Sequence, residues 1–96
     1  MTNPLEFLEI ILSLRSHFSF SVTSWLRTPT RNTAVGGHPN SKHLTGLAVD
    51  VVLDPGQDKE AFKAEVVARM LTAVDEGDHI HIQVKKTPHD LYGNKV

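Results

Sequence analysis

The sequence predicts one α+β domain in which a small sheet is combined with flanking helices. Two segments, residues 4–17 and 59–70, carry apolar residues at helical spacing. Segments rich in β-branched or alternating apolar residues, as strands are, lie at 18–26, 46–53, 71–74 and 79–84. The last two of these strands flank a tight turn and therefore form an antiparallel hairpin. With 96 residues, the chain suits a single domain over residues 1–96, with one modest core and one site.

The first helix has a recognisable start. Asn3 can cap it, and Pro4 suits its first turn. We predict that this helix runs to about residue 17. The residues that follow with helical spacing are Leu5, Leu8, Ile11 or Leu12, and Arg15.

A strand and a long loop follow. In the strand at 18–26, aromatic and β-branched residues alternate with polar ones, and Phe18, Phe20 and Val22 would point to the same side. Residues 27–42 contain two prolines and two adjacent glycines but no apolar periodicity, so we predict a long ordered loop. Loops of this length inside compact domains are often functional.

The second strand, residues 46–53, has two unlike faces. Alternation places Leu47, Val49 and Val51 on one face, and Gly46, Ala48 and Asp50 on the other. The small residues leave space beside the carboxylate of Asp50. Burying that carboxylate is costly without a partner. If no metal binds there, the Asp50 carboxylate would be explained by an edge position for this strand, or by a hydrogen bond from the hydroxyl of Ser41 or Thr45.

The second helix and the hairpin complete the predicted elements. Asp58 can cap the helix at 59–70. Its apolar stripe is Phe62, Val66 and Met70, with Val67 nearby. Gly77 lies in the hairpin turn, where a positive φ is needed. Residues 85–96 have mixed polarity, and we predict a loosely packed tail.

Composition excludes several classes of protein. Lys and Arg number 10 against 11 Asp and Glu, which does not suit the one-sided basic surface of a nucleic-acid-binding protein. The absence of cysteine excludes disulfides and a thiolate zinc site. Apolar stretches are shorter than the roughly 18 residues of a membrane span, so we expect a soluble protein without a membrane partner. The first residues lack the features of a signal peptide, so we expect synthesis in the cytoplasm without export by that route.

Two histidines and an aspartate dominate the functional interpretation. Two imidazoles and one carboxylate, from His43, His81 and Asp50, form the ligand set of a catalytic zinc site whose fourth position is left to water. A bend around Gly46 would let the side chains converge. Taken alone, each histidine would more often be a surface or hydrogen-bonded core residue. The ligand set also suits other divalent transition metals, but zinc is our first choice, and a metal-dependent hydrolase is the leading hypothesis.

Three acidic residues are candidates for the general base, the group that takes the proton of a zinc-bound water. We favour Glu76, which has the longer reach across the hairpin turn, over Asp78 and then Asp75. On a regular strand Asp78 would point away from His79 and His81. His79 shares the face of His81 and would donate a hydrogen bond to a developing oxyanion, because a fourth protein ligand would close the site.

Two residues at the start of the long loop and just before it are candidates for substrate binding. Arg27 could anchor a substrate carboxylate or carbonyl, although arginines on loops are often only solvated. Trp25 is predicted to pack in the core or at its rim, with a role as a substrate platform as the alternative.

Three blocks of the sequence together resemble the M15 peptidases, the family of D-alanyl-D-alanine carboxypeptidases and L,D- and D,D-peptidases that shares its fold with Hedgehog signalling domains. The most specific block is Ser41-x-His43-x-x-Gly46-x-Ala48-x-Asp50 followed by His79-x-His81. Residues 22–29 resemble the Ser-x-x-Arg strand end of this family, and Asn32-x-x-Val35-Gly36-Gly37 resembles the loop before the ligand histidine. The resemblance covers about residues 20–84.

The resemblance implies an antiparallel sheet with helices on one side, a single zinc ion and a set of residue roles. The implied zinc ligands are His43, Asp50 and His81. Arg27 would bind and polarise the substrate, and Ser41 would orient the site by hydrogen bonding. The general base would be an acidic residue near His81, but related sequences place it at different offsets, so both Glu76 and Asp78 stay candidates.

The resemblance further implies a substrate among the D-amino-acid-containing stem peptides and cross-bridges of bacterial peptidoglycan. This short chain is similar to compact single-domain members encoded by bacteriophages, which implies a monomeric enzyme that acts on the cell wall during lysis or remodelling. Two alternatives remain. The domain could be a non-catalytic binding module in which zinc is structural, or a virion component whose peptidase fold serves assembly.

Overall fold

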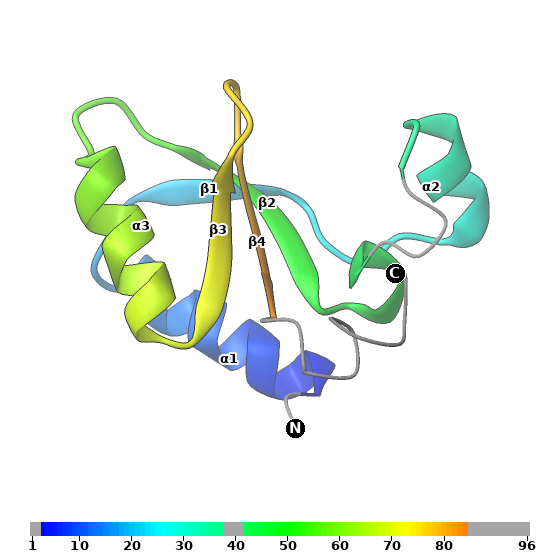
Figure 1. Cartoon of the computed structure of the whole chain (residues 1–96), viewed down its shortest axis with the longest axis horizontal. Coiled ribbons are helices and arrows are strands. Elements are labelled where there is room, and N and C mark those ends of the chain that lie inside the picture. Colours follow the sequence, from blue (N-terminus) through cyan, green and yellow to red (C-terminus); the bar gives the residue numbers. More distant parts are fainter. Residues whose placement is uncertain (1–2, 38–41, 85–96) are drawn as a thin grey trace, which may run out of the picture.

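The computed structural model of the chain describes residues 3–37 and 42–84. In chain order its elements are α1 (Pro4–Arg15), β1 (Phe20–Ser24), α2 (Pro29–Ala34), the 3₁₀ turn η1 (Lys42–Thr45), β2 (Ala48–Leu53), α3 (Lys59–Ala68), β3 (Leu71–Asp75) and β4 (Ile80–Val84). The four strands form one antiparallel sheet in the order β1-β2-β4-β3 (Figure 1). This is the predicted α+β class. Ser41 and the predicted tail at 85–96 lie outside the described residues.

The hydrophobic core lies between one face of the sheet and the helices α1 and α3. Its buried side chains are Phe7, Ile11 and Leu14 of α1, Phe62 and Val66 of α3, and Phe20, Val49, Val51, Leu71, Ile80 and Ile82 of the strands. The ring of Phe62 meets the rings of Phe18 and Phe20 edge to face, with centroids 5.2 and 5.3 Å away. α2 lies away from α1 and α3, at the other end of the molecule from α3 (Figure 1).

The predicted start of α1 is confirmed, but of the residues predicted at helical spacing only Ile11 belongs to its buried face. Asn3 and Glu6 form a capping box around Pro4. The buried residues are Phe7, Ile11 and Leu14, whereas Leu5 and Leu12 are 65% and 61% exposed. Apolar residues occur on several sides of this helix, and helical spacing alone does not decide which of them packs. The sheet selects the side that carries the large ring of Phe7.

Residues 27–42 do not form a continuous loop, because they contain α2. The Thr28 side chain accepts a hydrogen bond from the backbone N–H of Arg31, and Pro29 occupies the first turn. The helix has six residues, which is too short to show an apolar period. Its capping residues were therefore the only local signal for it.

The start of α3 is confirmed, and the helix ends two residues before the predicted Met70. The Asp58 side chain accepts from the backbone N–H of Ala61. Phe62 and Val66 are buried, but the helix ends at Ala68, and Met70 is 68% exposed with a φ of 65°. This left-handed conformation is typical of the residue after a helix end, and it turns the chain into β3.

The predicted hairpin and the two faces of β2 are present. Gly77, in the turn between β3 and β4, has a φ of 93°. Val49 and Val51 of β2 belong to the core, and Leu47, which precedes the strand, packs against it. Asp50 consequently faces the other side of the sheet, where it pairs in register with His81 of β4.

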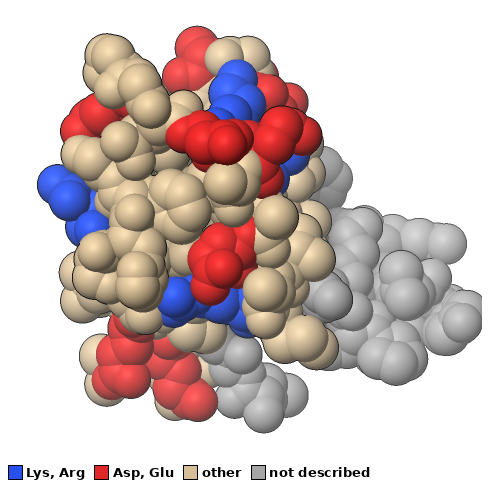
Figure 2. All heavy atoms as spheres, turned by 90° about the vertical axis from the view of Figure 1, so that its left-hand side faces the viewer, with Lys and Arg blue, Asp and Glu red and all other residues tan. Residues whose placement is uncertain are grey.

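Acidic and basic side chains are mixed on the side of the molecule that carries α3 (Figure 2). Ion pairs of this helix join Lys59 to Asp75 at 3.1 Å and Arg69 to Glu65 at 3.2 Å. Acidic side chains cover more of the face shown than basic ones do, with the two signs side by side. Within 3–37 and 42–84, the helices are too short and too polar to cross a membrane.

Candidate metal centre

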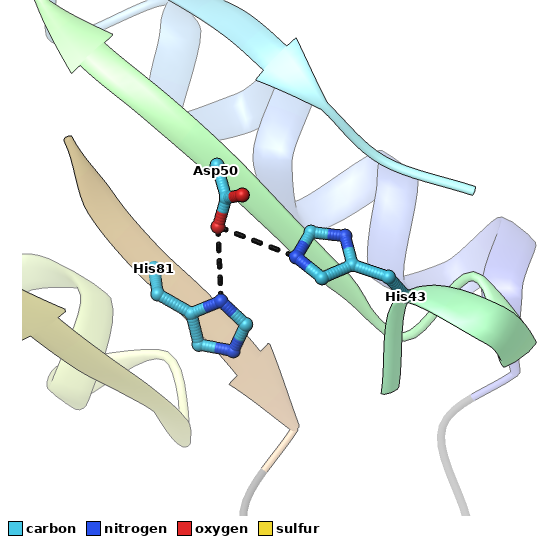
Figure 3. A group of neighbouring side chains, drawn as sticks. All are labelled: His43, Asp50 and His81. Carbon is cyan, nitrogen blue, oxygen red and sulfur yellow. Dashed lines mark hydrogen bonds and ion pairs between the residues drawn. The ribbon is translucent and has the colours of Figure 1, made fainter. Parts of the chain in front are cut away.

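The two central strands bring Asp50 and His81 together. β2 and β4 are antiparallel neighbours with Asp50 directly opposite His81, so both side chains leave the same face of the sheet (Figure 3). Oδ1 of Asp50 lies 2.9 Å from Nδ1 of His81. Because β2 is an inner strand of the sheet, an edge position does not explain the buried carboxylate of Asp50.

His43 reaches the same carboxylate from η1. Its Nε2 lies 3.3 Å from Oδ1 of Asp50, and its ring is almost completely buried. The predicted bend lies at Gly46, whose φ is 75° and whose N–H donates to the carbonyl oxygen of His43. One potential ligand atom from each of His43, Asp50 and His81 lies within 4.8 Å of the others. The structure therefore brings the three predicted metal ligands together.

Hydrogen bonds on the outer side of each imidazole set its tautomer. Nδ1 of His43 lies 2.7 Å from the carbonyl oxygen of Trp25, and Nε2 of His81 lies 2.8 Å from Oε1 of Gln83. Both partners are oxygens that can only accept, so these ring nitrogens carry hydrogens. The other nitrogen of each ring faces Asp50: it donates a hydrogen bond to the carboxylate when the ring is protonated, and it offers a lone pair to a metal when the ring is neutral. Metal-binding histidines are commonly held in this way, and the residues present fit a divalent metal such as zinc.

The charges at this centre are mutually stabilising. Burial raises the pKa of the Asp50 carboxyl, but hydrogen bonds from His43 and His81 outweigh burial and hold this pKa well below its usual range. Arg27 adds an ion pair, with Nη2 3.2 Å from Oδ2 of Asp50. The hydrogen bond to Asp50 raises the pKa of His81 despite its burial, and Gln83 acts in the same direction. Around neutral pH, Asp50 is thus ionised and ready to bind a cation.

An open pocket of about 450 Å³ lies over this group. Its lining consists of Arg27, Val35, Gly37, His43, Asp50, Glu76, His79, His81 and Gln83. Of the three candidates for the general base, Glu76 is the one in this lining. The side chain of Asp78 is 90% exposed, and Asp75 pairs with Lys59. The arrangement favours Glu76, in agreement with its longer reach.

His79 lies at the edge of the group. Its Nε2 is 3.9 Å from Oδ1 of Asp50 and 4.0 Å from Oε1 of Glu76. Its Nδ1 donates to Oδ1 of Asp78 at 2.6 Å. Since Nδ1 already carries a hydrogen, Nε2 can donate to a substrate oxygen only when the ring is protonated.

The predicted substrate-binding residues have different positions. Arg27 lines the pocket. Trp25 packs against the core, and its indole N–H donates to the carbonyl oxygen of Gly46 at 2.9 Å. These contacts favour a packing role for Trp25 over a role as a substrate platform. Ser41, predicted to orient the site, lies outside the described residues.

Sequence reasoning assigned no role to Gln83 or Asn32. Gln83 lies two residues after His81 on β4, so strand alternation puts both on the same face. That signal was available. Asn32 accepts a hydrogen bond from Arg27, and this contact depends on the fold of α2, which the sequence did not reveal.

Zinc binding is expected to strengthen as the pH rises through the raised pKa of His81, because the metal must displace the proton on Nδ1. In metal-free protein, the raised pKa of His81 contributes to the stability of the fold. This contribution is complete below the pKa that His81 has in the unfolded chain, and it is lost as the pH rises through the pKa that His81 has in the folded protein. The zinc-induced rise in Tm should therefore grow between about pH 5 and about pH 8. Thermal unfolding with and without zinc measures it. A pH-independent rise would contradict the assignment of His81 as a ligand.

Comparison with known proteins identifies the family of this chain. A sequence model of the family described as Peptidase M15 matches residues 2–83, a range that includes His43, Asp50 and His81. No curated protein and no solved structure matches the chain at a significant level. The family match spans most of the chain and confirms the family to which the sequence blocks pointed. The chain belongs to the Peptidase M15 family.

Proposed function

We propose that this chain is a zinc-dependent peptidase that hydrolyses amide bonds in the peptides of bacterial peptidoglycan. Its family is a peptidase family. The observation that carries the proposal is the convergence of His43, Asp50 and His81 within 4.8 Å in an open pocket that Glu76 and Arg27 also line. A metal that activates water and a base that takes its proton can hydrolyse an amide without a protein nucleophile, and a cationic side chain can hold the substrate.

Each group has a definable task. Zinc held by His43, Asp50 and His81 would lower the pKa of a bound water to about 7 and polarise the amide carbonyl. Glu76 would take the proton of that water and pass it to the leaving amine. Arg27, held beside Asp50 by its ion pair, would bind a carbonyl or carboxylate oxygen of the substrate.

The proposed substrate class rests on the resemblance of the ligand block to that of D-alanyl-D-alanine carboxypeptidases and related wall peptidases. Stem peptides and cross-links of peptidoglycan supply both the amide bond and carboxylate groups for Arg27. A part in lysis or wall remodelling by a bacteriophage is the setting we propose, on the same resemblance. The chain would then act on the cell wall as a monomer after its synthesis in the cytoplasm.

The test is mass spectrometry of purified peptidoglycan fragments incubated with zinc-loaded and metal-stripped protein in parallel. New fragments that require zinc would support the proposal, and their masses would identify the amide that is cut. Asp50→Asn protein purified in the same way is the control for contaminating hydrolases. If zinc binds stoichiometrically but no fragment forms, the enzyme proposal fails. A binding module or a virion component would then be the better description, and stable co-purification with capsid or tail proteins would identify the latter.

A further inference from the structure

Arg27 is held by three side chains from different parts of the fold. Its Nε donates to Oγ of Ser24, its Nη1 to Oδ1 of Asn32 and its Nη2 to Oδ2 of Asp50, each at 3.2 Å. A guanidinium has five N–H groups. These contacts leave one hydrogen on each terminal nitrogen, the number that a bidentate contact with a substrate oxygen pair needs.

The contact from α2 is made by a buried polar residue. Asn32 is 3% exposed and is the buried side chain of its six-residue helix. Apolar packing therefore does not explain why this side of α2 faces inward. A buried carboxamide needs hydrogen-bond partners, and the oxygen of Asn32 accepts from the charged Arg27, a bond stronger than one between neutral groups.

Gly37 provides the space for this contact. A Cβ at Gly37 would lie 2.1 Å from Oδ1 of Asn32 and 3.0 Å from Nη1 of Arg27, so any side chain would displace their hydrogen bond. The neighbouring Gly36 differs. Its φ is 73°, and a Cβ there would meet nothing within 4 Å. The positive φ, and not a lack of space, therefore accounts for glycine at position 36. The N–H of Gly37 also donates to the backbone carbonyl oxygen of Asn32 at 2.8 Å.

We propose that Asn32, in the space left by Gly37, is a positioning residue that fixes the guanidinium of Arg27 toward the substrate. Asn32 holds one terminal nitrogen while Asp50 holds the other, so the plane of the guanidinium cannot turn about its Nε–Cζ bond without breaking a charge-assisted hydrogen bond. The catalytic consequence rests on the proposed peptidase function. The immobilisation of Arg27 does not.

The first test follows Arg27 without substrate. Nitrogen NMR of the arginine side chains reports the rotation that exchanges Nη1 with Nη2. Asn32→Ala should speed this rotation in Arg27 by roughly 10- to 100-fold, as expected for the loss of a hydrogen bond to a charged group. Gly37→Ala should do the same. Asn32→Asp, which keeps an acceptor oxygen, should keep the rotation slow.

Matched variants control for damage to the surrounding segment. Thr33→Ala changes the next residue of α2, whose side chain is exposed and bonds to the backbone oxygen of Pro29. Gly36→Ala strains the backbone without contacting Arg27. Neither should change the rotation of Arg27. Unchanged rotation in Asn32→Ala, or equal changes in Thr33→Ala, would overturn the positioning role.

The second test measures turnover and zinc affinity. If Asn32 positions Arg27, Asn32→Ala should lower kcat/KM by about 10- to 100-fold, the range typical of supporting residues, while zinc affinity changes less, and Asn32→Asp should restore most of the loss. Equal kcat/KM in Asn32→Ala and wild type would overturn the catalytic consequence. If the wild type shows no turnover at all, the peptidase proposal fails, and the rotation of Arg27 alone still decides whether Asn32 immobilises it.

Discussion

Asp50→Asn is expected to remove most of the stabilisation by zinc and to abolish turnover. Both imidazoles direct a nitrogen to Oδ1 of Asp50, so this residue is the centre of the proposed ligand set. At a zinc concentration of 100 times Kd, binding stabilises a protein by about 2.7 kcal/mol, and a variant that binds a hundredfold more weakly keeps only about 0.4 kcal/mol. The measurement is the zinc-induced shift in Tm, together with zinc affinity by calorimetry.

Asparagine preserves the size of the side chain, so the change removes charge rather than packing. Asp54→Asn is the matched control, because Asp54 follows β2 directly but bonds to Ser19 and is not among the residues that line the pocket. Its zinc-induced shift should equal that of the wild type. If Asp50→Asn gains as much Tm from zinc as the wild type does, the ligand assignment is wrong.

Glu76→Gln is expected to lower kcat by roughly 10²- to 10⁴-fold, the usual contribution of a general base, with zinc still bound. Glu76 lines the pocket with the three ligands, and its carboxylate lies at 4.0 Å from Nε2 of His79. Glutamine keeps the length and the polarity of the side chain but cannot take a proton. Single-turnover kinetics of peptide cleavage and zinc affinity measured on the same preparation separate loss of chemistry from loss of metal.

Asp78→Asn and Asp75→Asn are the matched comparisons for this variant. The Asp78 side chain points into solvent and bonds to Nδ1 of His79, so Asp78→Asn should affect kcat only through the orientation of His79 and by less than Glu76→Gln does. Asp75, paired with Lys59, should have no effect on turnover. A large loss in Asp78→Asn with normal turnover in Glu76→Gln would transfer the role of base to Asp78.

Local signals in the sequence predicted the parts of the fold that local contacts decide. Asn3 and Asp58 bond to backbone groups a few residues ahead, and Gly77 supplies a φ that its own turn needs. The buried face of α1 and the end of α3 depend on contacts with the sheet, which helical spacing does not contain. Met70 illustrates this, since it continues an apolar stripe in sequence but turns away from the core.

The candidate site was predictable where residue chemistry is unusual for its surroundings. A carboxylate in the apolar run of β2 requires partners, and Asp50 has them in His43, His81 and Arg27. Asn32 carries no such signal, because an asparagine in a polar loop is ordinary. The role proposed for Asn32 depends on where α2 places it, and that placement is a property of the tertiary structure.

The pairing of Asp50 with His81 couples the metal centre to the alignment of β2 and β4. Because side chains alternate along a strand, a slip of one residue would turn His81 into the core and present Ile80 or Ile82 to the pocket. Such a misaligned sheet would lose apolar burial and metal ligands together. During folding, zinc would bind only chains whose central strands are correctly matched, and so it would draw the population toward that one alignment.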